Sequence, residues 1–217
     1  MTKRRMPAGE RRAQIIAAAR RVFSQHGYDG AKTLQIAREA NVSEALVYRH
    51  FPSKLALYRA VLKQIFHDQD ERWQQQGIQD PSAAGLATSI QRFIADSVND
   101  AQNPERLDTH RMTLASLAGD GSYASLIYRR SQRRNQRTME RAFDAARAEG
   151  MAEEPVSTLA AAMFIEHVGT MIAAIGTLPP ASQPYGISGE ELTRQATWFC
   201  LRGIGMSDEA IRKYLKD

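Results

Sequence analysis

A short segment between Lys32 and Lys54 concentrates side chains that can contact the bases and phosphates of a nucleic acid. Glu44 can accept a hydrogen bond from a cytosine amine, Leu46 can contact a thymine methyl group, and Arg49 can donate to guanine or to a phosphate. Lys54 falls in the first turn of a predicted helix, where the helix dipole disfavours a cation. A phosphate bound there would satisfy both the lysine and the helix.

The same residues also have purely structural explanations, which the sequence leaves open. Glu44 can serve only as a negative charge at the start of a helix, and Thr33 can cap a helix without contacting phosphate. Lys54 can be an ordinary solvated lysine.

The charge distribution favours a polyanionic partner for this part of the chain. The net charge of +5 divides unevenly, because residues 1–60 hold 12 Lys and Arg against 4 Asp and Glu, whereas residues 61–217 hold 17 against 20. A basic N-terminal quarter on a slightly acidic remainder is typical of nucleic-acid binding, with a merely solvated basic surface as the alternative. A basic arm, Thr2 to Arg5, can reach a minor groove or fray in solvent.

Two short helices joined by a tight turn are predicted to carry these side chains. Thr33 can cap the first helix, which continues to Ala40, and Asn41 tolerates the left-handed conformation that a tight turn needs. Ser43 can cap the second helix, Glu44 to His50. This is the pattern of a helix-turn-helix, in which the second helix enters the major groove of DNA.

Longer helices are predicted to support this pair. Apolar residues recur at helical spacing from Glu10 to His26, and Gly27 is the expected stop. Pro52 ends the recognition helix, and Ser53 can cap a helix that runs from Lys54 past Phe66 toward Trp73. Further helices are predicted at 83–100, 104–118, 122–149, 155–178, 190–203 and 208–215. No stretch shows sustained strand alternation, so we expect an all-α fold.

Other classes of protein have weaker support in the sequence. The single cysteine, Cys200, rules out an intramolecular disulfide, suits a reducing cytoplasm, and is interpreted as inert core rather than a redox sensor. The apolar stretch 156–178 carries Glu166 and His167 at its centre, where a membrane would disfavour charge, so we expect a buried helix. The sequence has no metalloprotease, P-loop or nucleophile-elbow motif, and we expect no enzyme activity, no metal and no cofactor.

Residues 27–62 resemble the DNA-binding domain of the TetR family of regulators, and the string VSEALVYRHFPSKLALYRAVL carries most of the likeness. Asn41 stands where Gly is usual, Leu46 where a small or hydroxylated residue is common, and Leu55 where Glu is frequent. The resemblance implies a three-helix DNA-binding domain over 8–68 and a larger helical domain over 69–217. It implies a set of DNA-contacting residues: Lys32, Thr33, Ser43, Glu44, Ala45, Leu46, Tyr48, Arg49, His50 and Lys54. Packing within the small domain is the alternative for Tyr48 and His50.

The resemblance also implies a homodimeric repressor that binds a near-palindromic operator and is released by a small-molecule effector. The dimer interface is expected within 155–178 and 190–203, and the effector cavity between the helices of residues 54–149. Candidate cavity residues are Phe66, Trp73, Phe93, His110, Met112, Leu117, Tyr123, Tyr128, Met163 and His167. Methionine and aromatic side chains favour an apolar or aromatic effector. A DNA-binding protein without a ligand switch, architectural or partner-regulated, is the alternative.

The long helix at 122–149 carries a cluster of arginines that the sequence does not assign to a role. They are Arg129, Arg130, Arg133, Arg134, Arg137 and Arg141. At this spacing a solvated face paired with acids is the simplest interpretation, and binding of an acidic effector or shaping of the DNA-facing side is the alternative.

Overall fold

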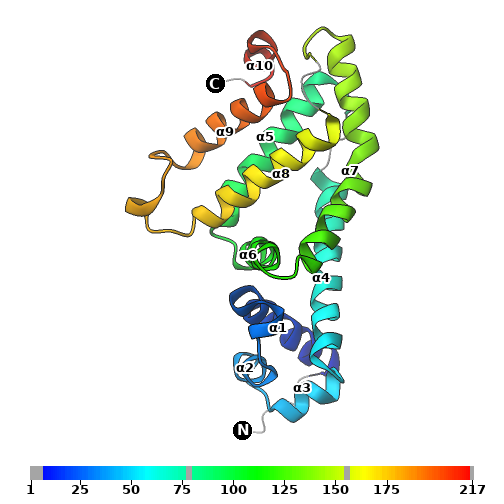
Figure 1. Ribbon diagram of the computed structural model, residues 1–217, viewed down its shortest axis with the longest axis vertical. Coiled ribbons are helices and arrows are strands. Elements are labelled where there is room, and N and C mark those ends of the chain that lie inside the picture. The colour runs from blue at the N-terminus through cyan, green and yellow to red at the C-terminus, as the bar shows by residue number, and fades with distance from the viewer. Residues whose placement is uncertain (1–6, 77–79, 154–156, 216–217) are drawn as a thin grey trace.

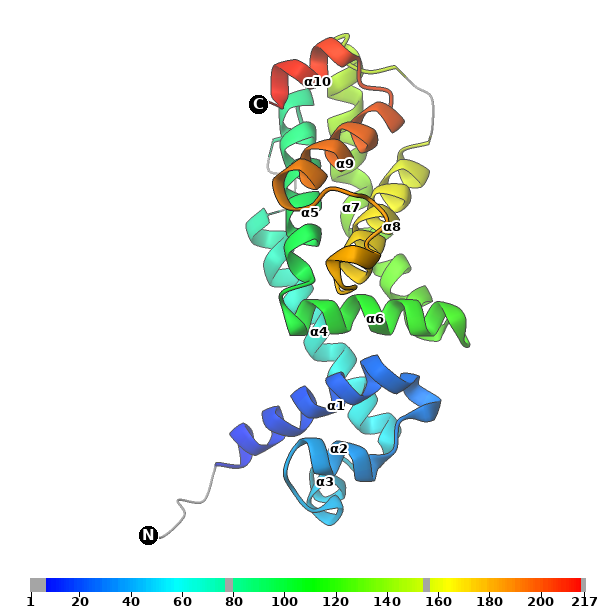
Figure 2. The same ribbon diagram turned by 90° about the vertical axis from the view of Figure 1, so that its left-hand side faces the viewer.

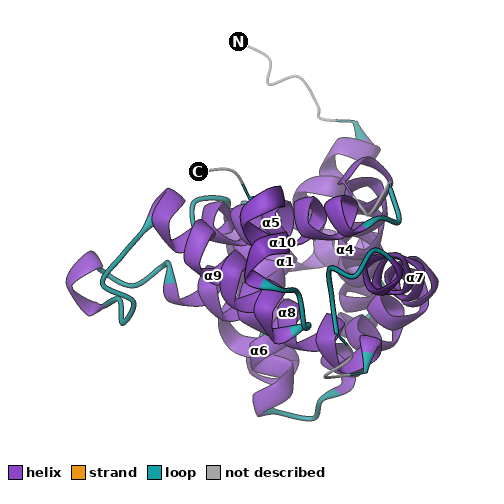
Figure 3. Cartoon of the chain, turned by 90° about the horizontal axis from the view of Figure 1, so that it is seen from above, coloured by secondary structure: helices purple, strands orange, loops and turns teal. Residues whose placement is uncertain are grey.

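The computed structural model describes residues 7–76, 80–153 and 157–215, and within these residues the chain forms helices and no β-strand (Figure 3). The helices are α1 (Ala8–Gly30), α2 (Thr33–Glu39), α3 (Glu44–His50), α4 (Lys54–Gln76), α5 (Ala83–Asp100), α6 (Pro104–Ala118), α7 (Ser122–Ala148), α8 (Thr158–Ile175), the short 3₁₀ helix η1 (Pro180–Ser182), α9 (Gly189–Gly203) and α10 (Asp208–Tyr214). The predicted all-α fold is confirmed. The basic arm Thr2 to Arg5 lies outside the described residues.

Polar side chains cap the starts of several helices, and the cap predicted at Ser43 is confirmed. Ser43, Ser82, Asn103, Ser157 and Ser207 each accept a hydrogen bond from a backbone N–H in the first turn of the helix that follows. Such a bond satisfies one of the N–H groups that a helix start leaves without a partner. These polar side chains therefore set where five of the helices begin.

Two predicted helices differ in extent from the structure. Gly27, expected as the stop of the first helix, has φ 66° and ψ 179°, and one further helical turn to Gly30 follows this break. Only glycine adopts such a conformation at little cost, so the break itself was correctly located. The predicted helix 155–178 is shorter in the structure, because Ser157 caps α8 at one end and Gly176 ends it at the other.

The molecule is elongated, with α1, α2, α3 and the start of α4 at one end and α5 and α7 to α10 at the other (Figure 1). Helix α4 is continuous and runs from the small end into the larger one. Helix α6 lies across the molecule between α1 on one side and the larger domain on the other (Figure 2). These two helices are therefore the physical link between the two ends.

Two clusters of buried apolar side chains hold the structure together. The first joins α1, α2, α3 and α4, and it also contains Met112 of α6 and Tyr123 and Ile127 of α7. The second lies among α5, α7, α8, α9 and α10 and contains Cys200, whose burial raises the pKa of its thiol to about 11. Because the first cluster includes side chains of α6 and α7, the small domain packs directly against the larger one.

Helix α8 was expected to be apolar all round and buried. It is the one described helix that is long and apolar enough to cross a membrane by length and composition alone, a test that core helices of soluble proteins also pass. Its inner face is buried, and Gly169 approaches Phe93 so closely that a Cβ atom would come within 2.6 Å of that ring. Its other face exposes Leu159, Phe164 and Met171, because a single chain supplies neighbours for only one side. Within the single chain, α8 is therefore buried on one face only.

Candidate nucleic-acid interface and internal cavity

The turn between α2 and α3 has the geometry that its sequence predicts. Asn41 adopts φ 52°, in the left-handed region, and the next residue, Val42, donates its N–H to the carbonyl of Ala37 at 2.9 Å. Ser43 then accepts from the N–H of Leu46 at 3.2 Å and starts α3. The turn and the cap together fix the angle between the two helices.

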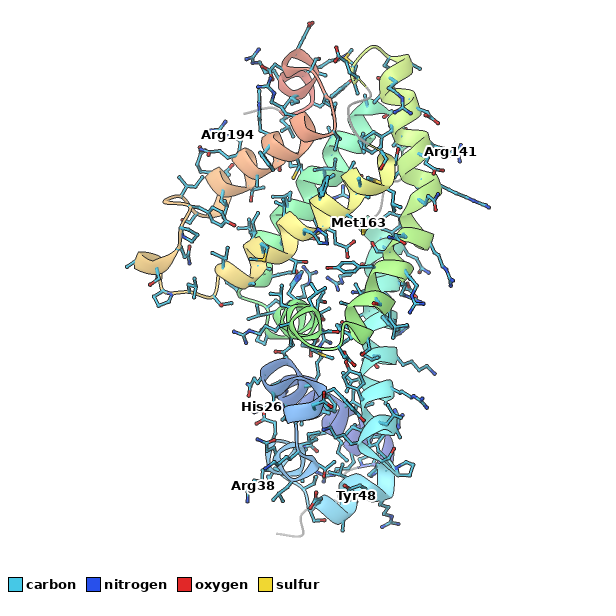
Figure 4. All side chains as sticks on the ribbon, in the orientation of Figure 1. His26, Arg38, Tyr48, Arg141, Met163 and Arg194 are labelled. Atoms are coloured by element: carbon cyan, nitrogen blue, oxygen red, sulfur yellow. The ribbon has the colours of Figure 1, made fainter. Side chains whose placement is uncertain are left out.

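Helix α3 presents one face to solvent and one to the core. Val47 is 1% exposed and packs in the first cluster, whereas Ala45, Tyr48 and Arg49 are exposed. Ser43 is also exposed, and Glu44, Leu46 and His50 are partly so. Tyr48 projects from α3 at the same end of the molecule as Arg38 of α2 (Figure 4). The predicted contact residues of α3 therefore lie on an accessible surface.

Thr33 does not cap α2, and that prediction is wrong. The cap position belongs to Lys32, whose backbone N–H donates to the side-chain oxygen of Gln35 at 2.8 Å. Thr33 is the first residue of the helix, and its hydroxyl donates to Glu44 at 2.5 Å and lies 3.1 Å from the hydroxyl of Tyr48. Thr33 therefore ties α2 to the recognition helix, and Glu44 is more than a charge at a helix end.

Lys54 has partners that hold it beside the end of α1. Its ammonium donates to the carbonyl of Asp29 at 3.2 Å and lies 4.7 Å from the centre of the Tyr28 ring. Ser53 caps α4 by accepting from the N–H of Ala56 at 3.1 Å. The cation is thus kept next to a helix start, where a phosphate oxygen can be bound by both. Lys32, directly before α2, is exposed.

Two further contacts position this unit and were missed by sequence reasoning. Gln14 donates to the carbonyl of Ala40 at 2.9 Å, and the guanidinium of Arg12 lies 4.9 Å from the centre of the Phe51 ring. Both residues belong to the polar side of α1, which a helical pattern marks only as solvent-facing. No local signal in the sequence identifies such partners.

The larger domain contains a cavity of about 250 Å³ among α4, α5, α6, α7 and α8. Four of the ten candidate residues line it: Trp73, Phe93, His110 and Tyr128. They come from four different helices, so the cavity depends on the packing of the whole domain.

The other six candidates lie outside this cavity, because the rotation of each helix points them elsewhere. Met112 and Tyr123 are buried in the first cluster, and Phe66 packs against that cluster beneath the guanidinium of Arg130. Leu117 is 51% exposed, and Met163 lies on α8 outside the lining (Figure 4). His167 is exposed and meets the edge of the Tyr128 ring from outside.

A charged cluster forms part of the cavity wall where α4, α5 and α6 meet. Asp100 lies 2.9 Å from both the Arg106 guanidinium and the His110 ring. Burial raises the pKa of Asp100, but the hydrogen bonds from His110 and Arg106 outweigh burial and lower the pKa overall. Asp96, 3.9 Å from Arg106, has its pKa raised mainly by burial. Arg72 completes the cluster from α4.

The cavity is therefore more polar than the sequence led us to expect. On α7 and α8, Ser131 donates to Glu166 at 2.5 Å, and both line the cavity. The apolar part of the wall comes from Trp73, Ile90, Phe93, Ile127, Met139, Ala162 and Ile165. A cavity with both kinds of wall fits a molecule that has an apolar body and a polar group better than a purely apolar one.

The described arginines of the α7 cluster do not line this cavity. Arg129, Arg133, Arg137 and Arg141 are exposed, which fits a solvated helix face. Arg130 forms an ion pair with Asp70 and covers the ring of Phe66. The side chain of Arg134 lies outside the described part of the structure.

The fold and the site define a two-part helical protein with a helix-turn-helix at one end and a cavity in the other. Residues 15–61 match the family model of the bacterial regulatory proteins of the tetR family. The helix-turn-helix region, residues 15–61, is therefore that of a tetR-family regulator.

Characterised relatives match over part of their length. The transcriptional regulator HbdR of Aromatoleum sp. is 34% identical over 143 residues, covering 65% of this chain and 59% of HbdR. The repressor KstR of Mycobacterium tuberculosis is 33% identical over 120 residues, covering 54% and 52%. The activator FasR of Mycolicibacterium smegmatis is 49% identical over 59 residues, 27% of each chain. The alignments thus span about a quarter to three-fifths of these relatives.

Solved structures share the fold over nearly the whole chain. A TetR-like transcriptional regulator from Rhodococcus sp. RHA1 has a TM-score of 0.67 and 16% identity, covering 92% of this chain and 98% of its own. SmeT, solved as a complex with triclosan, has a TM-score of 0.63 and 18% identity, covering 93% and 94%. The larger domain therefore has the same architecture as in these proteins, although its sequence has diverged.

Proposed function

We propose that this protein is a homodimeric DNA-binding transcriptional regulator of the cytoplasm, a repressor that leaves its operator when a small molecule fills the cavity. The observation that carries the proposal is the exposed face of α3, capped by Ser43 and presented by a left-handed turn at Asn41. The match of residues 15–61 to a family of regulators adds to it, because these residues contain the whole helix-turn-helix.

The surface around α3 supports contact with a phosphate backbone. Lys32, Arg38 and Arg49 are exposed, and Lys54 is held at the start of α4. Neutralising phosphates with such groups releases counterions, so affinity should fall steeply with salt. Base contacts would come from the first turns of α3, where Glu44, Ala45 and Leu46 lie.

The proposed dimer uses the exposed faces of α8 and α9. Phe164 is 61% exposed and Phe199 is 69% exposed, and Leu159 and Met171 of α8 are exposed as well. Large apolar side chains at this exposure are typical of surfaces that another chain covers. A two-fold axis through these helices would repeat α3 on the partner, and two recognition helices about 34 Å apart match successive major grooves of a near-palindromic operator.

The cavity favours a ligand switch over the alternative of a DNA-binding protein with a closed core. Such an alternative requires a filled interior, whereas the structure has a lined space of about 250 Å³. One structural relative, SmeT, was solved with triclosan bound. An effector shifts the equilibrium toward release only by as much as it binds the released form more tightly.

The experiment that tests the proposal is selection of DNA sites from a random pool with the full chain, followed by footprinting of the region upstream of its own gene at physiological salt. We expect a protected near-palindromic site. The variant Tyr48→Ala with Lys54→Ala should lose this protection while its circular dichroism spectrum stays helical.

A matched control replaces residues of the same types far from α3. Tyr185→Ala with Lys213→Ala removes an exposed tyrosine and an exposed lysine in the larger domain. This variant should bind DNA like the wild type. Absence of any selected or protected site for the wild-type protein would overturn the proposal.

A further inference from the structure

Among the described residues, Arg72 lines the cavity and has carboxylates nearby but forms no ion pair of its own with any of them. Arg72 of α4 lines the cavity, and its guanidinium has a single partner among the described residues, the carbonyl of Asp68, at 3.4 Å. This bond, from Nε, is long, and it leaves the Nη donors of the guanidinium available. Arg72 is half-buried, so its charge is only partly hydrated.

The carboxylates around Arg72 are engaged by other cations. Asp68 lies 3.2 Å from Arg20, and Asp100 lies 2.9 Å from both Arg106 and His110. Arg72 therefore faces two carboxylates whose charges are already opposed by partners of their own. Asp96, whose pKa the charge of Arg72 lowers, lies 3.9 Å from Arg106.

The surroundings of Arg72 are unfavourable for an unpaired cation. Burial and the nearby positive charge of Arg106 lower the pKa of Arg72. An anion placed against Arg72 would oppose the positive charges of Arg72 and Arg106, and it would replace the water that burial has removed from the guanidinium. A hydrogen bond to a charged group is stronger in such a partly buried site than in solvent. The neighbouring residue, Trp73, and Phe93 and Ile165 add apolar walls to the same cavity.

We propose that the effector is a small organic carboxylate with an apolar or aromatic body, whose anionic group binds Arg72 inside the cavity while the body packs on Trp73 and Phe93. This inference rests on the proposed function, because it assigns the effector to this cavity. A single negative charge is favoured over a phosphate dianion, since Asp96 also lines the cavity and would repel a second charge. Planar carboxylates match the fork of a guanidinium, which binds them through two parallel hydrogen bonds.

The test uses the purified full chain and a panel of straight-chain carboxylates from butanoate to decanoate together with phenylacetate, phenylpropanoate and phenylbutanoate. Each is paired with its primary amide and with the amine of equal length. Isothermal titration calorimetry on the wild-type protein should find carboxylates that bind about tenfold or more tightly than their amides, the ratio expected for a hydrogen bond to a charged partner. The amines should bind more weakly still.

Variants locate the anionic group. Arg72→Gln should bring the carboxylate and its amide to within about twofold of each other, and Arg72→Lys should retain most of the preference. Arg129→Gln, an exposed arginine of α7 outside the cavity, should change nothing. If Arg72→Gln does not fold, the comparison of carboxylate, amide and amine on the wild-type protein still decides the charge that the cavity selects.

The proposal is overturned if no carboxylate of the panel binds at millimolar concentration, if amines bind more tightly than carboxylates, or if the folded Arg72→Gln variant keeps the carboxylate preference. DNA binding of the wild-type protein without ligand is measured separately. A protein that binds its operator but no carboxylate loses only this inference, and one that binds carboxylates through Arg72 but no DNA loses the proposed function.

Discussion

Replacing Arg20 should destabilise this protein far more than replacing its neighbour Arg21. The Arg20 side chain is 9% exposed, and its guanidinium contacts Asp68 of α4 at 3.2 Å, Thr109 of α6 at 2.6 Å and the carbonyl of Glu105. Breaking a buried ion pair costs about 3–5 kcal/mol. The side chain of Asp68 is 32% exposed and can recover some hydration, so we expect about 3 kcal/mol for Arg20→Met.

Arg21 provides a control of the same residue type on the same helix. It forms an ion pair of 2.7 Å with Glu39, but both side chains are 44% exposed. Exposed pairs contribute about 0–1 kcal/mol, so Arg21→Met should cost less than about 1 kcal/mol. For a chain of this size, about 1 kcal/mol shifts the melting temperature by about 2–4 °C. Arg20→Met should therefore lower it by about 6–12 °C and Arg21→Met by less than about 4 °C.

Thermal and urea unfolding followed by circular dichroism measure both variants. Equal losses for Arg20→Met and Arg21→Met would refute the reasoning, because Arg20 differs from Arg21 in its burial and in its hydrogen bonds to α6. Asp68→Asn should lose less than Arg20→Met, since the contacts to α6 remain. A double variant that loses the sum of the two single losses would show that the Arg20–Asp68 pair contributes nothing of its own.

Three further outcomes are expected. Phe164→Glu with Phe199→Glu should convert the dimer to a monomer in analytical ultracentrifugation, whereas Leu117→Glu, at an exposed leucine outside α8 and α9, should not; a wild-type monomer would contradict the proposed interface. Asp96→Asn should tighten carboxylate binding roughly fivefold, because two like charges at about 4 Å repel by about 1 kcal/mol in water-like surroundings, and an unchanged affinity would place the anion elsewhere. Burial raises the pKa of Cys200 from 9.0 to about 11. At neutral pH the thiolate fraction is therefore about a hundredfold lower in the native protein than in the unfolded one. The rate at which Ellman's reagent modifies Cys200 should show this difference, and in the native protein it should rise with pH toward 11.

Local chemistry made the helix-turn-helix predictable. The caps at Ser43 and Ser53 and the left-handed turn at Asn41 each depend on a residue and its immediate neighbours in the chain. The role of Thr33 could not be predicted from its neighbours in the chain, because a threonine at a helix start fits the cap position and the first helical position equally well. The backbone angles of Lys32 decide between them, and the hydroxyl of Thr33 is then free to reach Glu44.

The cavity was less predictable because it depends on how five helices rotate against one another. Met112 and His110 are two residues apart on α6, yet His110 lines the cavity and Met112 is buried in the first cluster. The importance of Arg72 depends on which neighbours neutralise Asp68 and Asp100, and those neighbours come from α1 and α6. A periodic pattern in the sequence predicts which residues share a face of a helix, but not which charged residues of neighbouring helices lie against that face.

Helix α6 contacts both the cavity of the larger domain and helix α1 of the small domain. On one side, Arg106 and His110 line the cavity and hold Asp100. On the other, the carbonyl of Glu105 and the hydroxyl of Thr109 accept from Arg20 of α1, and Asp108 accepts from Ser24 of α1 at 2.7 Å. These contacts are short and buried, so α6 cannot shift toward a bound anion without moving α1 or breaking them. Gln14 of α1 in turn donates to the carbonyl of Ala40 at the end of α2, so in the proposed switch a shift of α6 would reach the helix pair that presents α3 (Figure 2). The hydrogen bonds from Arg20 and Ser24 to α6 are thus the contacts through which, in the proposed switch, a ligand in the cavity would change the spacing of the recognition helices.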